Sequence, residues 1–256
     1  MVESNFKVSV VIPAYNEEAV IEPTVRELSN ALEAAGLAYE IRVVDDQSID
    51  STWAILSRLS AEIAAVRPVR NQGKGGYGLA VRAGLSSFEG DAVIVSMADG
   101  SDSPRDVVAY AQALANGYDC AFGNRFSAQS QVQDYPLVKK VLNRAGNLLI
   151  ACLTGYRQYR DFTNGFKGYR RHVVEAMAPL ISADFNLTVE MSVKAVLSGA
   201  SAKIIPNSWR DREGGVSKFN VGRLGPRYLA TIAYCVLGDY IRRAGARERN
   251  EPVDAA

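Results

Sequence analysis

The chain has 256 residues, of which 48% are hydrophobic, enough to bury a full core in one domain or in one domain with an appendage. Its 29 basic and 28 acidic residues nearly cancel, so no global field would draw it onto nucleic acid, and any site for a charged ligand must be local. The three cysteines lie far apart without CxxC spacing, which argues against a zinc or disulfide framework and fits a reducing compartment.

The first residues lack the basic-then-apolar order of a signal peptide, and no run of about 18 apolar residues appears along the chain. We therefore expect a cytoplasmic protein that does not span a bilayer.

Short apolar runs alternate with helix-period segments in the first half of the chain, a pattern typical of a parallel sheet covered by helices. Strands are predicted at 8–13, 39–45, 66–70, 92–98 and 118–123, with helices between them. After about residue 125 the alternation stops, and longer helical patterns follow at 137–153 and 187–197. The sequence therefore predicts an α/β fold whose second half is built differently from its first.

Acidic residues follow three of the predicted strands. Glu17 follows the first strand, Asp45 and Asp46 end the second, and Asp99 and Asp102 follow a later one. The carboxyl ends of parallel strands meet in one crevice, where several carboxylates are costly unless a cation joins them. A hard divalent ion that is held by oxygen and bridges phosphates is the predicted occupant. The alternative is that these residues only cap helices and form turns.

The glycine-rich segment at 73–78 and the single histidine do not indicate a further catalytic site. The segment GKGGYG at 73–78 matches the dinucleotide-binding pattern, but it follows the third strand instead of the first. We interpret it as a tight turn that brings Lys74 near phosphate. The single histidine, His172, excludes a zinc triad or a Ser-His-Asp relay and is predicted to be a surface residue.

Five segments, in order, resemble motifs of family-2 glycosyltransferases, and within them the dolichol-phosphate mannose synthase group. They are VIPAYNEE at 11–18, VDDQS at 44–48, GNRF at 123–126, DFTNGF at 161–166 and DREGGVSK at 211–218. The resemblance, which covers about residues 7–220, implies a GT-A fold: a Rossmann-like, mostly parallel sheet flanked by helices. It implies a glycosyltransferase domain at 1–225, with a nucleotide-sugar half at about 1–125 and an acceptor half at about 126–225. An amphipathic interfacial helix at 226–246 and a polar tail at 247–256 would follow.

The resemblance also implies roles for individual residues. Asp99 is the expected ligand of Mg²⁺ or Mn²⁺, with Asp102 in support, because Met97 stands where the family usually has a further aspartate. Asp99, Arg125, Arg212 and Lys218 are the expected catalytic residues, the last three as phosphate-binding cations. Donor contacts are expected from Pro13, Tyr15, Glu17, Val43, Asp45, Lys74, Ala98, Asp99 and Ser101, and acceptor-side roles from Asp161, Asn164 and Glu190.

The implied reaction moves a hexose, with inversion, from a donor of the GDP-mannose or UDP-glucose type to a polyprenyl or dolichyl phosphate. A lipid phosphate is already ionised, whereas a hydroxyl acceptor needs a base, for which Asp161, Asp184 and Glu190 are candidates. With a phosphate acceptor, Asp161 and Glu190 should tolerate neutral substitution. A family-2 enzyme that uses a hydroxyl acceptor in glycan or glycolipid assembly is the alternative. A non-catalytic homologue that binds nucleotide-sugar is another, because of Met97.

Two basic amphipathic helices favour the lipid and a peripheral position on the inner face of the membrane. The alternative is that they pack on the core or on a second subunit in a homo-oligomer. Their apolar faces comprise Val138, Val141, Leu142, Ala145, Leu148, Leu149 and Cys152 in the first helix, and Leu229, Ile232, Ala233, Val236, Leu237, Tyr240 and Ile241 in the second.

Overall fold

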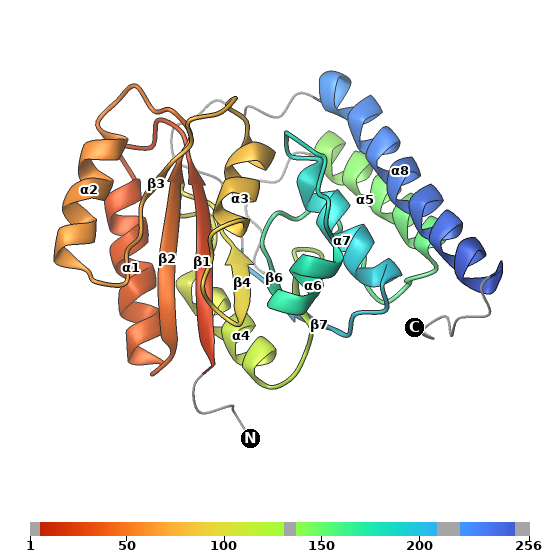
Figure 1. The fold of residues 1–256 in the computed structure, drawn as a ribbon, viewed down its shortest axis with the longest axis horizontal. Coiled ribbons are helices and arrows are strands. Elements are labelled where there is room, and N and C mark those ends of the chain that lie inside the picture. Colours follow the sequence, from red (N-terminus) through yellow and green to blue (C-terminus); the bar gives the residue numbers. More distant parts are fainter. Residues whose placement is uncertain (1–5, 131–136, 209–220, 249–256) are drawn as a thin grey trace.

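One seven-stranded sheet organises the residues that this computed structural model describes, 6–130, 137–208 and 221–248. Its strand order is β3-β2-β1-β4-β6-β5-β7 (Figure 1). All neighbouring strands are parallel except β6, which runs antiparallel to both β4 and β5. The strands are β1 (Lys7–Ala14), β2 (Ala38–Asp45), β3 (Val69–Arg70), β4 (Ala92–Val95), β5 (Cys120–Asn124), β6 (Lys167–Arg170) and β7 (Ala202–Pro206).

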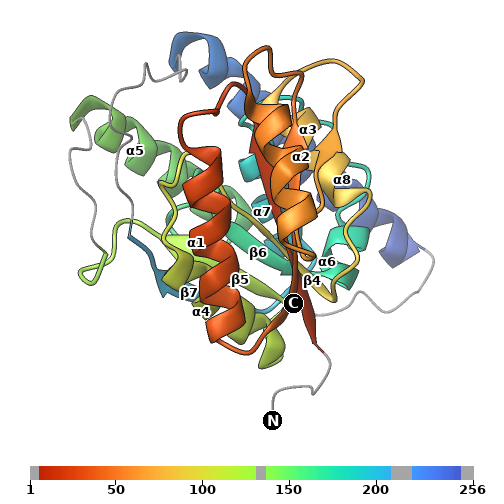
Figure 2. The ribbon, with the colours of Figure 1, turned by 90° about the vertical axis from the view of Figure 1, so that its left-hand side faces the viewer.

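Helices cover both faces of the sheet (Figures 1 and 2). Their residues divide into two apolar clusters, one on each face. The first cluster includes α1 (Ile21–Ala34), α2 (Thr52–Glu62) and α4 (Pro104–Ala115). The second includes α3 (Tyr77–Leu85), α5 (Leu137–Thr154), α6 (Arg171–Ala176), α7 (Leu187–Leu197) and α8 (Val221–Glu248). In Figure 1, α8 lies at the right-hand side of the molecule, beside α5 and α7.

The alternation of side chains along β1 explains the two layers. Val10 and Ile12 belong to the cluster on one face, whereas Val11 belongs to the cluster on the other, and all three are fully buried. A strand buried on both faces is therefore mostly apolar, and the buried Ser9 of β1 donates its hydroxyl to Glu40 Oε1 at 2.6 Å. After α1, the chain turns at Gly36, whose φ of 66° is a conformation that glycine adopts at little cost.

The expected α/β architecture, a mostly parallel sheet flanked by helices, is confirmed. Strands β6 and β7 were not predicted, and β4 ends at Val95, three residues earlier than expected. The predicted boundary near residue 125 coincides with the end of β5, yet β6 returns to lie between β4 and β5. Both halves of the chain therefore build one sheet.

The C-terminal helix is longer than predicted. It begins at Val221 and ends at Glu248, so it includes the start of the expected polar tail. The remainder of that tail lies outside the described residues. In the part of the chain that the structure describes, no helix combines the length and the apolarity needed to cross a membrane.

Candidate active site

The reversed direction of β6 brings segments from both halves of the chain to one edge of the sheet. The carboxyl ends of β1, β2, β4 and β5 lie along this edge. Because β6 is antiparallel, its amino end lies there too, and the preceding loop at 161–166 arrives beside the residues that follow β5. This edge is the place where an open α/β sheet binds its ligands.

The loops that follow β1 and β2 lock together at this edge. The backbone N–H of Asn16 donates to Ser48 Oγ at 3.0 Å, and Ile49 N–H donates to Asn16 Oδ1 at 2.9 Å. Asn16 and Gln47 have φ values of 54° and 65°, which side-chain-bearing residues adopt only at some cost. Beside them the Tyr15 side chain is 44% exposed, so an aromatic surface stands next to a rigid pair of loops.

Two consecutive carboxylates at the end of β2 have different tasks. Asp45 is fully buried, accepts a hydrogen bond from Ser48 N–H at 3.2 Å and forms an ion pair with Arg70 at 3.4 Å. Asp46 accepts hydrogen bonds from Asn71 Nδ2 at 2.6 Å and from Gly76 N–H at 2.7 Å. Asp46 therefore ties the glycine-rich segment to the edge of the sheet.

The glycine-rich segment at 73–78 is a tight turn into α3, as interpreted from the sequence. Gly78 N–H donates to the carbonyl of Ala183 at 2.9 Å, and a Cβ at Gly78 would lie 2.7 Å from the Ala183 carbonyl carbon. Tyr77 stacks on Phe185, with ring centroids 4.3 Å apart. The glycines thus permit close packing on the segment that leads into α7.

Asp99 and Asp102 follow β4 at the same edge. Asp102 is 8% exposed and accepts hydrogen bonds from Met97 N–H at 2.9 Å and Ser96 Oγ at 3.3 Å. Asp99 is half-buried and accepts one from Ser101 N–H at 3.1 Å. Burial, reinforced by the negative charge of Asp99, raises the pKa of Asp102 to about 7.

This pair of aspartates fits a divalent ion that also binds phosphate. A cation would offset the burial and mutual repulsion that raise the pKa of Asp102. Within residues 6–130, 137–208 and 221–248, no group of three His, Cys, Asp or Glu side chains could hold a metal ion alone. Mg²⁺ commonly takes one or two carboxylates and completes its shell with water and substrate phosphates, which is the arrangement that this pair allows.

Arg125 follows β5 and is anchored by Asp161. Its Nε donates to Oδ2 of Asp161 at 3.0 Å, Nη2 donates to Oδ1 at 2.7 Å, and its backbone N–H donates to Oδ2 at 2.9 Å. Asp161 is fully buried. Nη2 also donates to Thr163 Oγ1 at 3.3 Å. A bidentate pair of this kind fixes the plane of the guanidinium, so Asp161 orients Arg125 at the edge that carries Asp99 and Asp102.

The family model for glycosyl transferase family 2 matches residues 9–177 of the chain. The chain belongs to glycosyl transferase family 2. It is 33% identical over 230 residues to a dolichol-phosphate mannosyltransferase of Pyrococcus furiosus, a match that covers 88% of this chain and 62% of the relative. It is 31% identical over 242 residues to a polyprenol monophosphomannose synthase of Mycolicibacterium smegmatis, covering 92% and 89%. The chain thus spans about three fifths of the first relative and nearly all of the second.

A third relative and a solved structure extend the comparison. Over 227 residues the chain is 32% identical to an undecaprenyl-phosphate 4-deoxy-4-formamido-L-arabinose transferase of Enterobacter, covering 87% of this chain and 65% of the relative. Its fold is similar to that of glucosyl-3-phosphoglycerate synthase from Mycobacterium tuberculosis, crystallised with Mn²⁺, uridine diphosphate and phosphoglyceric acid. The TM-score is 0.68 at 19% identity, covering 91% of this chain and 79% of the neighbour, a likeness of fold alone.

Asp161 was one of three candidates for a general base in this family-2 chain. The other two, Glu190 and Asp184, are also bound to neighbouring groups. Glu190 is fully buried and accepts hydrogen bonds from Ser182 N–H at 2.8 Å, Ile181 N–H at 2.9 Å and Lys194 Nζ at 2.9 Å. Burial alone would raise the pKa of Glu190, but these hydrogen bonds hold it below its usual value. Asp184 forms an ion pair with Arg227 of α8. Each of these carboxylates thus fixes structure around the start of α7.

A polar contact adds to the attachment of α8. Asn186 Nδ2 donates to Ser182 Oγ and to Thr231 Oγ1 of α8, both at 2.9 Å. Together with the Asp184–Arg227 ion pair, it fastens α8 to the segment that packs on the glycine-rich turn.

The remaining expected site residues divide into three groups. Pro13, Glu17, Ala98 and Ser101 lie at the expected edge, in or just after β1 and β4. The Val43 side chain is fully buried in the core, so the expected donor contact at Val43 stays a prediction. The expected cations Arg212 and Lys218, with the whole loop at 211–218, lie outside the described residues.

Asn164 belongs to a buried polar cluster that sequence reasoning did not identify. Its Nδ2 donates to the Gly123 carbonyl at 3.0 Å and to Asn207 Oδ1 at 3.3 Å. A Cβ at Gly123 would lie 2.0 Å from Tyr110 Oη, so only glycine fits. Lys167 was also missed, although a lysine inside the short apolar segment GFKGYR was a signal that could have drawn attention to it.

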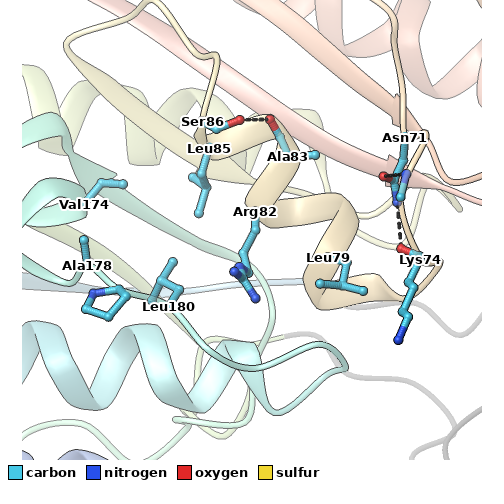
Figure 3. Close-up of a pocket in the computed structure, with 12 residues that line it drawn as sticks. Asn71, Lys74, Leu79, Arg82, Ala83, Leu85, Ser86, Val174, Ala178 and Leu180 are labelled. Atoms are coloured by element: carbon cyan, nitrogen blue, oxygen red, sulfur yellow. Dashed lines mark hydrogen bonds between the residues drawn. The ribbon is translucent and has the colours of Figure 1, made fainter.

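A separate groove of about 700 Å³ lies between α3 and the residues at 174–180 (Figure 3). Lys74 and Arg82 line it with mainly apolar neighbours, and Asp99, Asp102 and Arg125 are not among its lining residues. Lys74 is one of its lining residues, and the Lys74 backbone carbonyl accepts a hydrogen bond from Asn71 Nδ2 at 3.1 Å.

The apolar faces of α5 and α8 are largely exposed. The expectation that they pack on the core holds for Ile232, which is 4% exposed. Val138 lies among residues whose side chains are not described. Large exposed side chains on the two helices are Val141, Leu142, Leu148, Leu149, Leu153, Leu229, Tyr234, Leu237, Tyr240 and Ile241.

Proposed function

We propose that this chain is an inverting, metal-dependent glycosyltransferase that moves a hexose from a nucleotide-sugar to a polyprenyl phosphate. The donor is of the GDP-mannose or UDP-glucose type, and the reaction takes place at the cytoplasmic face of the membrane. The names of the relatives support a lipid-phosphate acceptor, since each names a dolichol, polyprenol or undecaprenyl-phosphate product or substrate.

The observation that carries the proposal is that each of the three candidate bases is already held by an ion pair or by hydrogen bonds. Asp161 is paired with Arg125, Asp184 with Arg227, and Glu190 with Lys194 and two backbone N–H groups. A hydroxyl acceptor needs a carboxylate able to take a proton in the transition state. A phosphate monoester brings an anionic oxygen of its own, because its second pKa is about 6. The arrangement of these carboxylates therefore favours a phosphate acceptor.

The donor would bind along the edge formed by the loops after β1, β2 and β4. Tyr15 would offer an exposed aromatic surface for the base, and Glu17 after β1 and Asp45 at the end of β2 are proposed to serve the ribose. Asp99 and Asp102 would hold Mg²⁺ or Mn²⁺, which supplies positive charge to the departing nucleoside diphosphate. Arg125, oriented by Asp161, stabilises developing phosphate charge.

The exposed apolar faces of α5 and α8 support a peripheral contact with the membrane. Leu237 and Tyr240 on α8, at 59% and 70% exposure, would enter the interface, while Arg242 on the same helix would meet lipid phosphates. The enzyme would thus meet its lipid acceptor at the membrane surface.

The test is incubation of the purified chain with labelled GDP-mannose or UDP-glucose, Mg²⁺ or Mn²⁺, and either polyprenyl phosphate or hydroxyl acceptors. We expect label in an acid-labile lipid, and loss of transfer when the metal is chelated. Two results together would contradict the proposal. One is transfer to hydroxyl acceptors alone, and the other is residual activity of Glu190→Gln or Asp161→Asn whose pH–rate profile lacks the acidic pKa of a general base. Binding of nucleotide-sugar without transfer to any acceptor would contradict catalysis itself.

A further inference from the structure

Strand β6 carries a lysine at a position where a charge is costly. The Lys167 side chain is 1% exposed, and its ammonium donates to the carbonyls of Phe162 at 2.7 Å, of Thr188 at 3.3 Å and of Asn164. Three acceptors use the full donor capacity of an ammonium. Even so, burial lowers the pKa of Lys167 to about 7. An apolar side chain would avoid this cost, and no role proposed so far requires the charge.

The charges that act on Lys167 belong to the phosphate-binding residues. The negative charge of Asp161 raises the pKa of Lys167, and the positive charge of Arg125 lowers it, although burial has the largest effect. The Tyr159 ring lies 5.8 Å from Nζ, and burial raises the pKa of Tyr159 so far that its hydroxyl stays neutral. The contact on the α7 side is the Thr188 carbonyl. Arg125, Asp161 and Lys167 thus form a buried series of cation, anion and cation.

The lysine has two consequences for Arg125. An Arg125–Asp161 pair by itself has no net charge, so it would attract a phosphate weakly, and protonated Lys167 restores one net positive charge. The carbonyls of Phe162 and Asn164 also belong to the loop that carries Asp161. The same ammonium therefore holds the backbone that positions the Arg125 anchor.

We propose that Lys167 is a positioning residue that keeps the Arg125–Asp161 pair oriented and net positive for a phosphate group of the substrates. The inference rests on the proposed function, in which Arg125 meets phosphate.

The test is the affinity of the full chain for inorganic pyrophosphate, UDP and GDP, measured by isothermal titration calorimetry at about pH 6, where Lys167 is protonated. Lys167→Met is expected to weaken binding by about tenfold, because one nearby positive charge is lost. Lys203→Met is the matched control: Lys203 is exposed on β7 with its ammonium 5.5 Å from the Tyr118 ring, so removing the same charge there should change affinity by less than about twofold. Lys167→Arg should restore most of the affinity. Equal affinities for wild type and a folded Lys167→Met would overturn the inference.

A second comparison covers the case in which Lys167→Met does not fold. Wild type and Lys167→Arg are measured at about pH 6 and about pH 8.5, because arginine stays protonated where Lys167 loses its proton. The wild type should lose affinity at the higher pH relative to Lys167→Arg. Asp102 titrates in the same range in both proteins, so it does not contribute to the difference. Identical pH dependence in the two proteins would overturn the inference.

These results separate the inference from the function on which it rests. A wild type that binds UDP or GDP but transfers no sugar to polyprenyl phosphate refutes the proposed acceptor, while the comparison at Lys167 keeps its meaning. A wild type that binds none of the three phosphate compounds refutes both.

Discussion

Asp161 holds Arg125 through three hydrogen bonds, so its replacement removes an anchor and not a base. We expect Asp161→Asn to lower kcat/KM by roughly tenfold to 100-fold, because a misplaced guanidinium no longer meets the phosphate. The earlier expectation that Asp161 tolerates neutral substitution is therefore revised. The pH–rate profile should lose no acidic limb, since no proton acceptor is lost, but its decline at higher pH should move to lower pH, because the charge of Asp161 raises the pKa of Lys167. Asp91→Asn, at the opposite edge of the sheet, is the matched control, and steady-state kinetics across pH is the measurement.

Asp99 lies where a metal ion and the donor phosphates would meet. Asp99→Asn removes one negative charge and one oxygen ligand, so we expect metal-dependent turnover to fall by on the order of 100-fold. Titration of activity with Mn²⁺ should show a weaker apparent affinity for the metal. A variant with wild-type turnover and an unchanged metal titration would show that the ion binds elsewhere.

The raised pKa of Asp102 predicts proton release on metal binding. With a folded pKa of about 7, above the usual 3.8, the side chain holds a proton at about pH 6. The stability that this bound proton contributes is present at acid pH and is lost as the pH rises through about 7. A divalent ion needs the ionised carboxylate, so its binding at about pH 6 should release close to one proton. Calorimetry in buffers of different ionisation enthalpy measures the release, which Asp102→Asn should abolish.

At the scale of elements, the exposed faces of α5 and α8 predict a membrane contact. Leu237 and Ile241 lie one turn apart on α8 and are 59% and 61% exposed. Replacing both by glutamate should lower binding to anionic vesicles by tenfold or more, roughly the effect of losing two buried leucine-sized side chains. Asn30→Glu with Ser57→Glu adds the same charge to exposed positions on α1 and α2 and should leave binding unchanged. Cosedimentation with vesicles distinguishes the two.

The elements that the sequence predicted well are those with a local signal. The strands around Val11 and Ile94 are short, near-continuous apolar runs, and this run of residues was sufficient to place them, although β4 ends earlier than predicted. Strand β6 has four residues and carries Lys167, so nothing local marks it as a central strand. Its pairing with β4 and β5 comes from tertiary contacts.

The sequence predicted which residues make up the candidate site, but not which of them contact one another. The sequence placed Asp99 and Asp102 together because both follow one strand. It could not show that Asp161 binds Arg125, 36 residues away, or that Asp184 binds Arg227, 43 residues away. Such partners are fixed by the antiparallel return of β6 and by the docking of α8, for which periodicity gives no information.

At the scale of the whole molecule, the two expected halves do not form separate units. β6 comes from the second half, yet it lies between β4 and β5 of the first. The edge that would bind the donor therefore includes Asp161 and its loop, so one sheet would position both proposed substrates.

If α8 contacts the membrane and the edge of the sheet binds the nucleotide-sugar, as proposed, the attachment of α8 to the segment at 182–186 would make the two thermodynamically linked ligands. Arg227 pairs with Asp184, the neighbouring Ala183 carbonyl accepts Gly78 N–H, and Asp46 binds the Gly76 N–H of the same turn. Whatever factor vesicles add to donor affinity, the donor must add to vesicle affinity.

We expect both factors to exceed one and to fall together in Arg227→Ala, which removes the ion pair between α8 and this segment and leaves the Asn186–Thr231 hydrogen bond in place. Arg58→Ala is the control, because Arg58 of α2 pairs with Glu22 of α1, and both helices belong to the apolar cluster on the face of the sheet opposite α8. Nucleotide titrations with and without vesicles, and cosedimentation with and without nucleotide, measure the two sides of this linkage. Donor affinity that is indifferent to vesicles in the wild type would show that α8 serves as an anchor alone. Factors above one would mean that a molecule already on the membrane binds its donor more tightly than one in solution.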